Sequence, residues 1–266
     1  MKRLITGVLT SAAWLLLLLL GPFPLFWLAI TALAGVALTE YLTIVLPDLS
    51  KQTRIPLILF GLLPLLGAYS GEATGVLCGL TLALVALLLH TLSRYTSFTQ
   101  PYEVISRSGF GYLYLSLCSA YLVLLMALPQ GRFWLLLLTA TTAASDTAAF
   151  YTGSKFGKHK LCPSISPGKT WEGFIGGLIG SLGAALLVQH FFLPGQGLVW
   201  ICLIVLLLGC LGAAGDLSES VIKRAFGVKD SGNLLPGHGG LLDRIDSLLL
   251  TAPVLYYLLY LQTGLC

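Results

Sequence analysis

The sequence predicts an all-α, polytopic integral membrane protein that forms a single membrane domain over residues 1–266. Hydrophobic residues make up 56% of the chain and charged residues only 10%, whereas about a quarter of an ordinary soluble domain is charged. The apolar residues gather in long runs, and a run such as 15–20 does not alternate with polar residues. Membrane-spanning strands alternate, so we expect helices, which satisfy their own backbone hydrogen bonds, to cross the bilayer.

About nine segments are apolar and long enough to span a membrane, which takes about 20 residues. They are residues 4–20, 23–46, 55–71, 74–92, 110–129, 132–152, 173–193, 198–217 and 244–262. The first segment follows Met-Lys-Arg and resembles a signal peptide, but no small-residue cleavage site comes after it. We therefore expect the first two segments to stay as a helical hairpin.

The positions of Lys and Arg predict the orientation of these helices. If the N-terminus is cytoplasmic, every Lys and Arg except Arg132 falls in or beside a cytoplasmic loop. Basic residues are enriched in cytoplasmic loops, so we expect the N-terminus inside the cell and the C-terminus outside. The protein is then a multi-pass protein of the cytoplasmic (inner) membrane, surrounded by membrane lipids, with its site facing the cytoplasm.

Two long loops are expected to carry the function. Among the expected cytoplasmic loops, residues 153–172 and 218–243 hold most of the Lys, Gly, Ser and His, and loops often carry function when a rigid scaffold positions them. We therefore interpret residues 1–130 as lipid-facing scaffold helices and residues 131–266 as the catalytic helices.

Several classes of function are disfavoured by composition. The net charge is only +4 and the basic residues stand between apolar runs, whereas nucleic-acid binding needs a clustered basic face. The six cysteines form no C-x-x-C pair, which argues against zinc and thioredoxin-type sites. Residues 173–180 carry glycines at small-xxx-small spacing, which indicates either close helix packing within the chain or a homodimer contact.

Carboxylates near the membrane are the first candidates for the site. An ionised carboxylate in hydrocarbon costs at least a few kcal/mol, and such residues are usually functional. The acidic residues in or at the ends of apolar segments are Glu40, Asp146, Asp216, Asp243 and Asp246. Asp243 and Asp246 share one helix face because they are three residues apart.

Asp216, Ser220 and Lys223 share another face if their helix continues beyond the membrane surface. At that end we expect the ammonium of Lys223 to reach water or substrate without burial. The alternative is an exposed, weak pair between Lys223 and Glu219, four residues apart.

Carboxylates beside basic residues suit phosphoryl or nucleotidyl transfer. Carboxylate oxygens hold Mg²⁺, two metal ions can clamp the attacking and leaving oxygens, and basic groups bind the remaining phosphate charge. The basic candidates are Lys223, Arg224, Lys229 and Arg244, and the Gly-rich segment between the carboxylates adds Asp230, His238, Gly239 and Gly240. The alternative is a set of ion pairs that join helix ends, with Arg244 as an anchor at the membrane interface.

The other loop contains a second set of phosphate-binding candidates. Lys169 and Thr170 precede an apolar segment, and phosphates bind at helix N-termini, although the spacing is not that of a Walker loop. Glu172 could cap this helix or take part in catalysis. Asp146 could bind nucleotide or form a buried pair with Lys155 or Lys169.

The segment from Ser220 to Asp246 closely resembles the C-terminal motif of the phosphatidate cytidylyltransferase (CDP-diacylglycerol synthase) family. That motif is S-x-x-K-R, four residues, K-D, and then P-x-H-G-G-x-x-D-R-x-D, and every fixed position is filled here. Residues 146–149, 166–173 and 215–217 also look like this family, and Glu40-Tyr41 is a weaker match.

The resemblance implies a nucleotidyltransferase of phospholipid biosynthesis that converts CTP and phosphatidate into CDP-diacylglycerol and pyrophosphate. It also implies Asp216, Asp243 and Asp246 as ligands of Mg²⁺, with a second metal ion as an alternative arrangement. Ser220 and Lys223 would lie near phosphate.

Other membrane proteins fit the sequence less well. A CDP-alcohol phosphotransferase would show D-G-x-x-A-R, and a polyprenyl-phosphate sugar-phosphate transferase would show adjacent Asp pairs; the chain has neither pattern. A transporter would show paired broken helices in two repeats, and a structural protein would not need the Gly-His-Gly-Gly loop.

Overall fold

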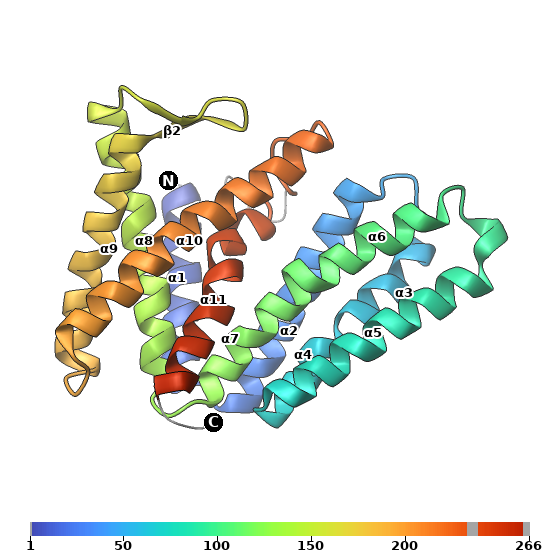
Figure 1. Cartoon of the computed structure of the whole chain (residues 1–266), viewed down its shortest axis with the longest axis horizontal. Helices are drawn as coiled ribbons and strands as arrows, with labels where there is room; N and C mark the ends of the chain where they lie inside the picture. The colour runs from blue at the N-terminus through green and yellow to red at the C-terminus, as the bar shows by residue number, and fades with distance from the viewer. Residues whose placement is uncertain (1, 233–238, 263–266) are drawn as a thin grey trace. The chain divides into compact units, whose positions relative to one another are not determined.

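The computed structural model describes residues 2–232 and 239–262, and most of this chain is helical (Figure 1). Within the described chain, eight helical segments are long and apolar enough to cross a membrane, and the apolar helix Gly7–Leu20 is shorter. The predicted all-α membrane fold with about nine helices is therefore confirmed. The cytoplasmic position of the N-terminus stays a prediction.

The elements follow one another in the order that the apolar segments predict. In chain order they are α1 (Lys2–Leu20), α2 (Phe23–Val45), α3 (Lys51–Gly61), α4 (Leu63–Gly67), η1 (Ala68–Ser70), α5 (Ala73–Ser93), η2 (Tyr95–Ser97), α6 (Pro101–Gly111), η3 (Tyr112–Leu117), α7 (Cys118–Ala127), α8 (Gly131–Phe156), β1 (Lys160–Cys162), β2 (Ser166–Thr170), α9 (Trp171–Phe192), α10 (Leu198–Ala225) and α11 (Leu242–Gln262).

The fifth predicted segment, residues 110–129, starts too late. The helix begins at Pro101, a residue suited to a first helical turn, and α6, η3 and α7 together form one span from Pro101 to Ala127. The apolar pattern does not predict the first turns of this helix, because their residues are polar. Those polar groups are used within the protein: Arg107 pairs with Glu103 and donates a hydrogen bond to the carbonyl of Val45 at 2.6 Å.

The two predicted loops are shorter than expected. Residues 153–172 contain the end of α8, an antiparallel hairpin of β1 and β2, and the start of α9 at Trp171. The helix α10 continues to Ala225, so the second loop begins only there. Backbone hydrogen bonds extend these elements beyond the apolar runs, and Asp216, Ser220 and Lys223 lie on one helix.

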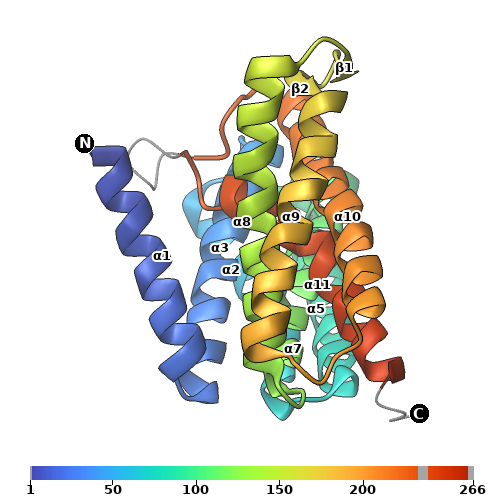
Figure 2. The same cartoon turned by 90° about the vertical axis from the view of Figure 1, so that its left-hand side faces the viewer.

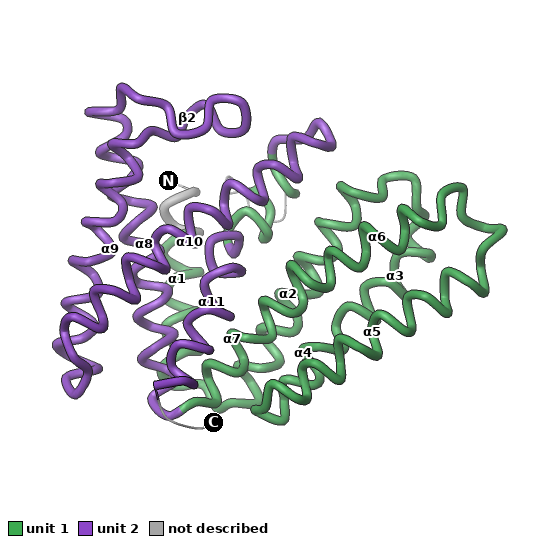
Figure 3. The backbone as a smooth tube through the Cα atoms, in the orientation of Figure 1, with its two compact units in different colours: residues 1–128, 230–244 green, residues 129–229, 245–266 purple. Residues whose placement is uncertain are grey.

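The chain divides into two compact units, which Figure 3 shows in different colours. The first contains residues 1–128 and 230–244, and the second contains residues 129–229 and 245–266. In the first unit, every residue of α7 from Cys118 to Met126 is buried, and α2 packs beside it. The short segment 230–244 therefore joins helices that precede it by more than a hundred residues.

In the second unit, α8, α9 and α10 lie side by side (Figure 2). The glycines of α9 face α8 closely: a Cβ atom on Gly177 would lie 2.8 Å from the Ser145 hydroxyl, and one on Gly180 would lie 2.6 Å from the Ala148 Cβ. The small-xxx-small spacing is thus used for packing within the chain. It gives no support to the homodimer contact that was the alternative.

We expect Gly177→Val to destabilise this packing. The added atoms must displace α8, and overpacking of this kind costs about 1–3 kcal/mol. The measurement is the melting temperature of the purified protein in detergent. Gly183→Val is the matched control, because a Cβ on Gly183 of the same helix meets no atom within 4 Å. Equal melting temperatures for the two variants would contradict the packing argument.

Candidate active site

Three helices of the second unit bring carboxylates together. The carboxylates are those of Asp146 on α8, Asp216 on α10 and Asp246 on α11. Asp246 is only 8% exposed, and the negative charges of Asp216 and Asp146 both act on it. Burying a carboxylate costs free energy unless hydrogen bonds or positive charges offset its loss of hydration. The backbone N–H of Ser247 offsets part of this cost, because it donates to Asp246 Oδ1 at 2.7 Å.

The close approach of α10 and α11 depends on Gly215. A Cβ atom there would lie 2.6 Å from the carbonyl oxygen of Asp246, so a larger residue would separate the two helices. Gly215 directly precedes Asp216. The Gly-Asp pair in the sequence therefore allows the contact and also supplies one of the carboxylates.

Lys169 supplies the positive charge of this cluster. Its ammonium lies 2.5 Å from Asp216 Oδ2, and both side chains are about one-third exposed or less. Its charge also reaches Asp246. The sequence left open whether Lys169 would pair with Asp146, and in the structure its ion pair is with Asp216.

Thr170 and Glu172 hold the base of the hairpin to α9. The hydroxyl of Thr170 accepts a hydrogen bond from the backbone N–H of Gly173 at 3.1 Å and so caps the helix. The carboxylate of Glu172 accepts N–H bonds from Lys158 and His159, and it lies 2.7 Å from the His159 ring. These contacts hold the turn between α8 and β1 against the first turn of α9, and the capping role of Glu172 stays a prediction.

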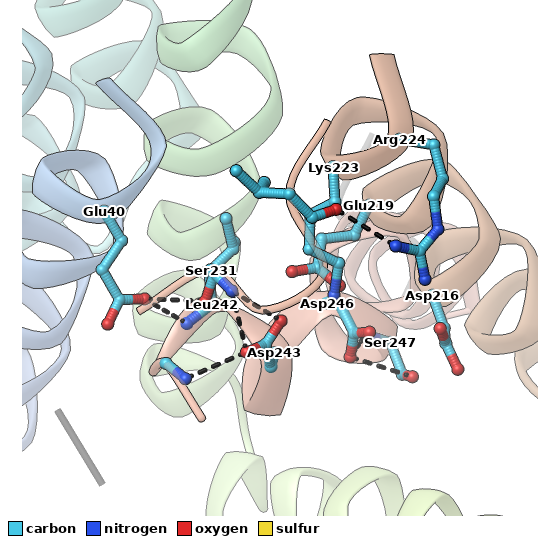
Figure 4. Close-up of polar contacts among 12 residues, drawn as sticks. Glu40, Asp216, Glu219, Lys223, Arg224, Ser231, Leu242, Asp243, Asp246 and Ser247 are labelled. Atoms are coloured by element: carbon cyan, nitrogen blue, oxygen red, sulfur yellow. Dashed lines mark hydrogen bonds and ion pairs between the residues drawn. The ribbon is translucent and has the colours of Figure 1, made fainter. Parts of the chain in front are cut away.

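Asp243 holds the segment that precedes α11 in the first unit. Its Oδ2 atom accepts hydrogen bonds from the backbone N–H of Gly240 at 2.9 Å and of Ser231 at 3.1 Å. Glu40 of α2 joins the same region, because its carboxylate accepts hydrogen bonds from the N–H group of Leu241 and from that of Leu242, which Figure 4 shows. Gly239 has a φ of 80°, a conformation that glycine adopts without strain.

The expectation that Lys223 extends into water without burial is wrong. Its ammonium lies 2.7 Å from Glu219, and the exposed fractions of the two side chains are 11% and 1%. Both side chains are therefore largely enclosed by the protein, and their ion pair is buried rather than exposed. Removing Lys223 would take the positive charge away from a buried carboxylate.

The other predicted residues near the end of α10 occupy different positions. Arg224 is exposed, and its guanidinium donates to the carbonyl of Val228 and, at 3.4 Å, to that of Ile165 in the turn between β1 and β2. Ser220 is half-buried, and Lys229, Asp230 and Arg244 are exposed. His238 lies outside the described residues.

Comparisons with known proteins show the family of the chain. A model of the cytidylyltransferase family matches residues 1–262. The chain belongs to the cytidylyltransferase family. It is 38% identical to the phosphatidate cytidylyltransferase of Bacillus subtilis (strain 168) over 98% of this chain and 97% of that protein.

Two staphylococcal proteins named phosphatidate cytidylyltransferase are also similar. That of Staphylococcus haemolyticus (strain JCSC1435) is 35% identical over 97% of this chain and 98% of its own length. That of Staphylococcus aureus (strain COL) is 39% identical over 64% of this chain and 69% of its own length. The protein is thus a nucleotidyltransferase with several membrane helices.

The cytidylyltransferase has donors of a kind that suits a hard cation. Asp216 and Asp246 are close enough to interact, and an ammonium lies against one of them, so this place attracts positive charge. Among residues 2–232 and 239–262, however, no group of three or more His, Cys, Asp or Glu side chains is arranged to hold a metal ion. The assignment of Asp216, Asp243 and Asp246 as metal ligands stays a prediction.

The sequence did not predict the burial of the Lys223–Glu219 pair or the partners of Glu40. The burial of Glu219 gave no signal, because E-x-x-x-K spacing is common on exposed helix faces. Glu40 was recognised as a membrane-embedded carboxylate, but its partners are separated from it by 201 and 202 residues. A carboxylate at the end of an apolar segment was the only local indication.

Proposed function

We propose that this cytidylyltransferase transfers the cytidylyl group of CTP to phosphatidate, giving CDP-diacylglycerol and pyrophosphate. The observation that carries the proposal is the cluster of Asp146, Asp216 and Asp246 on three membrane helices, with Lys169 of the hairpin against Asp216. A reaction between a nucleotide and a lipid phosphate needs such charged groups at the bilayer. The names of the three relatives support phosphatidate as the acceptor.

In this reaction an oxygen of the phosphatidate phosphate attacks the α-phosphorus of CTP. A new phosphoanhydride bond forms, the bond from the α-phosphorus to the oxygen that bridges it to the β-phosphorus breaks, and pyrophosphate leaves with that bonding pair. The attacking phosphate is already an anion near neutral pH, so the step needs no strong general base. The main obstacle is repulsion between two anions, which positioned positive charges reduce.

We assign the cationic residues to this task. Lys169 lies on the hairpin, and the base of this hairpin is held by Thr170 and Glu172. Lys223, Arg224, Lys229 and Arg244 are proposed to bind the phosphates of CTP and of the lipid. Ser220, Asp230, His238 and the Gly239–Gly240 backbone are assigned to the same sites by their places in the motif.

Asp216, Asp243 and Asp246 are proposed to hold Mg²⁺. When bound, this cation supplies positive charge that neutralises the triphosphate and the developing pyrophosphate. The negative charge of Asp146 would add to that of this site, since it acts on Asp246.

The purified protein in mixed micelles, incubated with CTP, Mg²⁺ and phosphatidate, tests the function. We expect equal amounts of pyrophosphate and CDP-diacylglycerol, and neither product when diacylglycerol replaces phosphatidate or when EDTA is added. Release of pyrophosphate without the lipid product would argue for a nucleotidase. Absence of both products from folded protein would contradict the proposal.

The site is proposed to face the cytoplasm, where CTP is found. In a variant without its native cysteines, we expect Gln52→Cys and Lys158→Cys to react with membrane-impermeant maleimide only after the cells are opened. Position 52 lies in the first turn of α3 and position 158 lies between α8 and β1, at helix ends that the basic residues place inside. The engineered Leu198→Cys at the N-terminus of α10 is the control for the other side. Labelling of positions 52 and 158 on opposite sides would overturn the topology.

A further inference from the structure

Glu40 binds the first turn of α11, a helix that follows it by about 200 residues. Its carboxylate accepts hydrogen bonds from the N–H groups of Leu241 at 3.0 Å and Leu242 at 2.9 Å, and from the Ser231 hydroxyl at 3.1 Å (Figure 4). The first N–H groups of a helix have no partner within it, and negative charge is favourable there. Glu40 therefore acts as the cap of a helix in a distant part of the chain.

Two glycines approach this carboxylate so closely that neither position has room for a side chain. A Cβ atom on Gly232 would lie 2.7 Å from Glu40 Oε1, and one on Gly240 would lie 2.6 Å from Glu40 Oε2. Leu241, Leu242 and Ser231 are all less than 9% exposed. The carboxylate thus fits closely against a backbone that has glycine at both points of closest approach.

The helix that carries Glu40 is itself anchored beyond this point. Arg107 donates to the carbonyl of Val45 at 2.6 Å, and Arg54 donates to that of Leu46 at 3.0 Å. The hydroxyl of Tyr41 donates to the carbonyl of Arg107 at 3.0 Å. These bonds connect the end of α2 to α3 and α6, so Glu40 projects from a fixed support.

We propose that Glu40 is a positioning residue of the transfer site. It sets the place of the first turn of α11, which carries Asp243, Arg244 and Asp246. Glu40 and Asp243 bind different backbone N–H groups of this segment. Asp243 accepts hydrogen bonds from the N–H groups of Ser231 and Gly240, and Glu40 accepts those from Leu241 and Leu242. The inference rests on the proposed function for its kinetic consequence, but the contact itself does not depend on it.

The Glu40→Gln variant tests the inference by amide hydrogen exchange and by kinetics. Gln keeps the shape, but it loses the charge and presents an NH₂ group to N–H donors. We expect faster deuterium uptake confined to peptides that cover residues 239–246. We also expect kcat to fall about ten- to hundredfold, because a displacement on the order of 1 Å can cost about a hundredfold. KM for CTP should rise as well, because the displaced segment carries Gly239, Gly240 and Arg244, which are assigned to bind phosphate.

Glu72→Gln is the matched control. Glu72 is also a carboxylate of the first unit that precedes a helix, α5, and its hydrogen bond is to Thr74. This variant should leave both the kinetics and the exchange of residues 239–246 as in the wild type. Unchanged exchange at residues 239–246 in Glu40→Gln, or a uniform increase across the chain in that variant, would overturn the inference.

Gly232→Ala provides a second test if Glu40→Gln folds poorly. The new methyl group must displace the Glu40 carboxylate, so this variant should reproduce the local exchange and the loss of kcat. Because both changes disturb one contact, the double variant should lose less than the product of the two single effects. Independent, multiplying effects would contradict the proposal. If the wild type makes no CDP-diacylglycerol, the proposed function fails, while the exchange measurements still decide the role of Glu40.

Discussion

Asp246→Asn is expected to abolish cytidylyl transfer without making the protein less stable. Asparagine keeps the shape of the side chain but removes the charge that a divalent cation needs. Stabilisation of charge by a bound cation amounts to several kcal/mol, and each 1.4 kcal/mol corresponds to about tenfold, so the loss is on the order of a thousandfold. Asp243→Asn is expected to be inactive for the same reason.

The stability of the Asp246 variant should remain equal to that of the wild type or rise. Asp246 is 8% exposed and its charge is opposed by those of Asp216 and Asp146, so removing it relieves repulsion and the cost of burial. The measurements are CDP-diacylglycerol formation and the melting temperature. Asp48→Asn, a change at an exposed position, is the control. An active Asp246→Asn protein would remove Asp246 from the proposed metal site.

Lys223→Ala is expected to cost both folding stability and activity. The substitution removes the ammonium that lies 2.7 Å from Glu219, a carboxylate with an exposed fraction of 1%. Taking one partner from a buried ion pair costs about 3–5 kcal/mol. The loss of a charged hydrogen bond to substrate phosphate would cost about 1.5–3 kcal/mol in addition. Thermal unfolding measures the first effect, and kcat/KM of the protein that remains folded measures the second.

The double variant Glu219→Leu/Lys223→Met separates these effects. Replacing both members of a buried pair with apolar residues is often neutral or stabilising, so this protein should melt near the wild-type temperature. If Lys223 also binds phosphate, the stable double variant stays impaired in kcat/KM. Recovery of full activity together with stability would show that Lys223 has only a structural role.

The sequence allowed the helical elements to be predicted because a bilayer imposes long apolar runs. The same rule failed at α6, where Glu103 and Arg107 make the first turns polar although they are helical. It also failed at the ends of α8 and α10, which continue beyond the apolar runs. Hydropathy predicts where a helix is surrounded by hydrocarbon, and it does not predict where the backbone hydrogen bonds end.

The candidate residues were predicted by motif, but their neighbours were not. Lys169 and Asp216 lie in separate segments, and nothing in either segment specifies that they pair at 2.5 Å. The burial of Glu219 likewise depends on packing around α10. Side-chain partners across helices are set by tertiary structure, which local spacing does not encode.

The contact of Glu40 with α11 has a consequence for the order of assembly during translation. Glu40 is synthesised about 200 residues before Leu241 and Leu242, and at roughly 5–20 residues per second this interval is on the order of 10–40 s. During that time α2 is in the membrane before the helix that it caps has been made. Nascent chains arrested before α11 would therefore leave the first unit incomplete and would be exposed to membrane quality-control proteases.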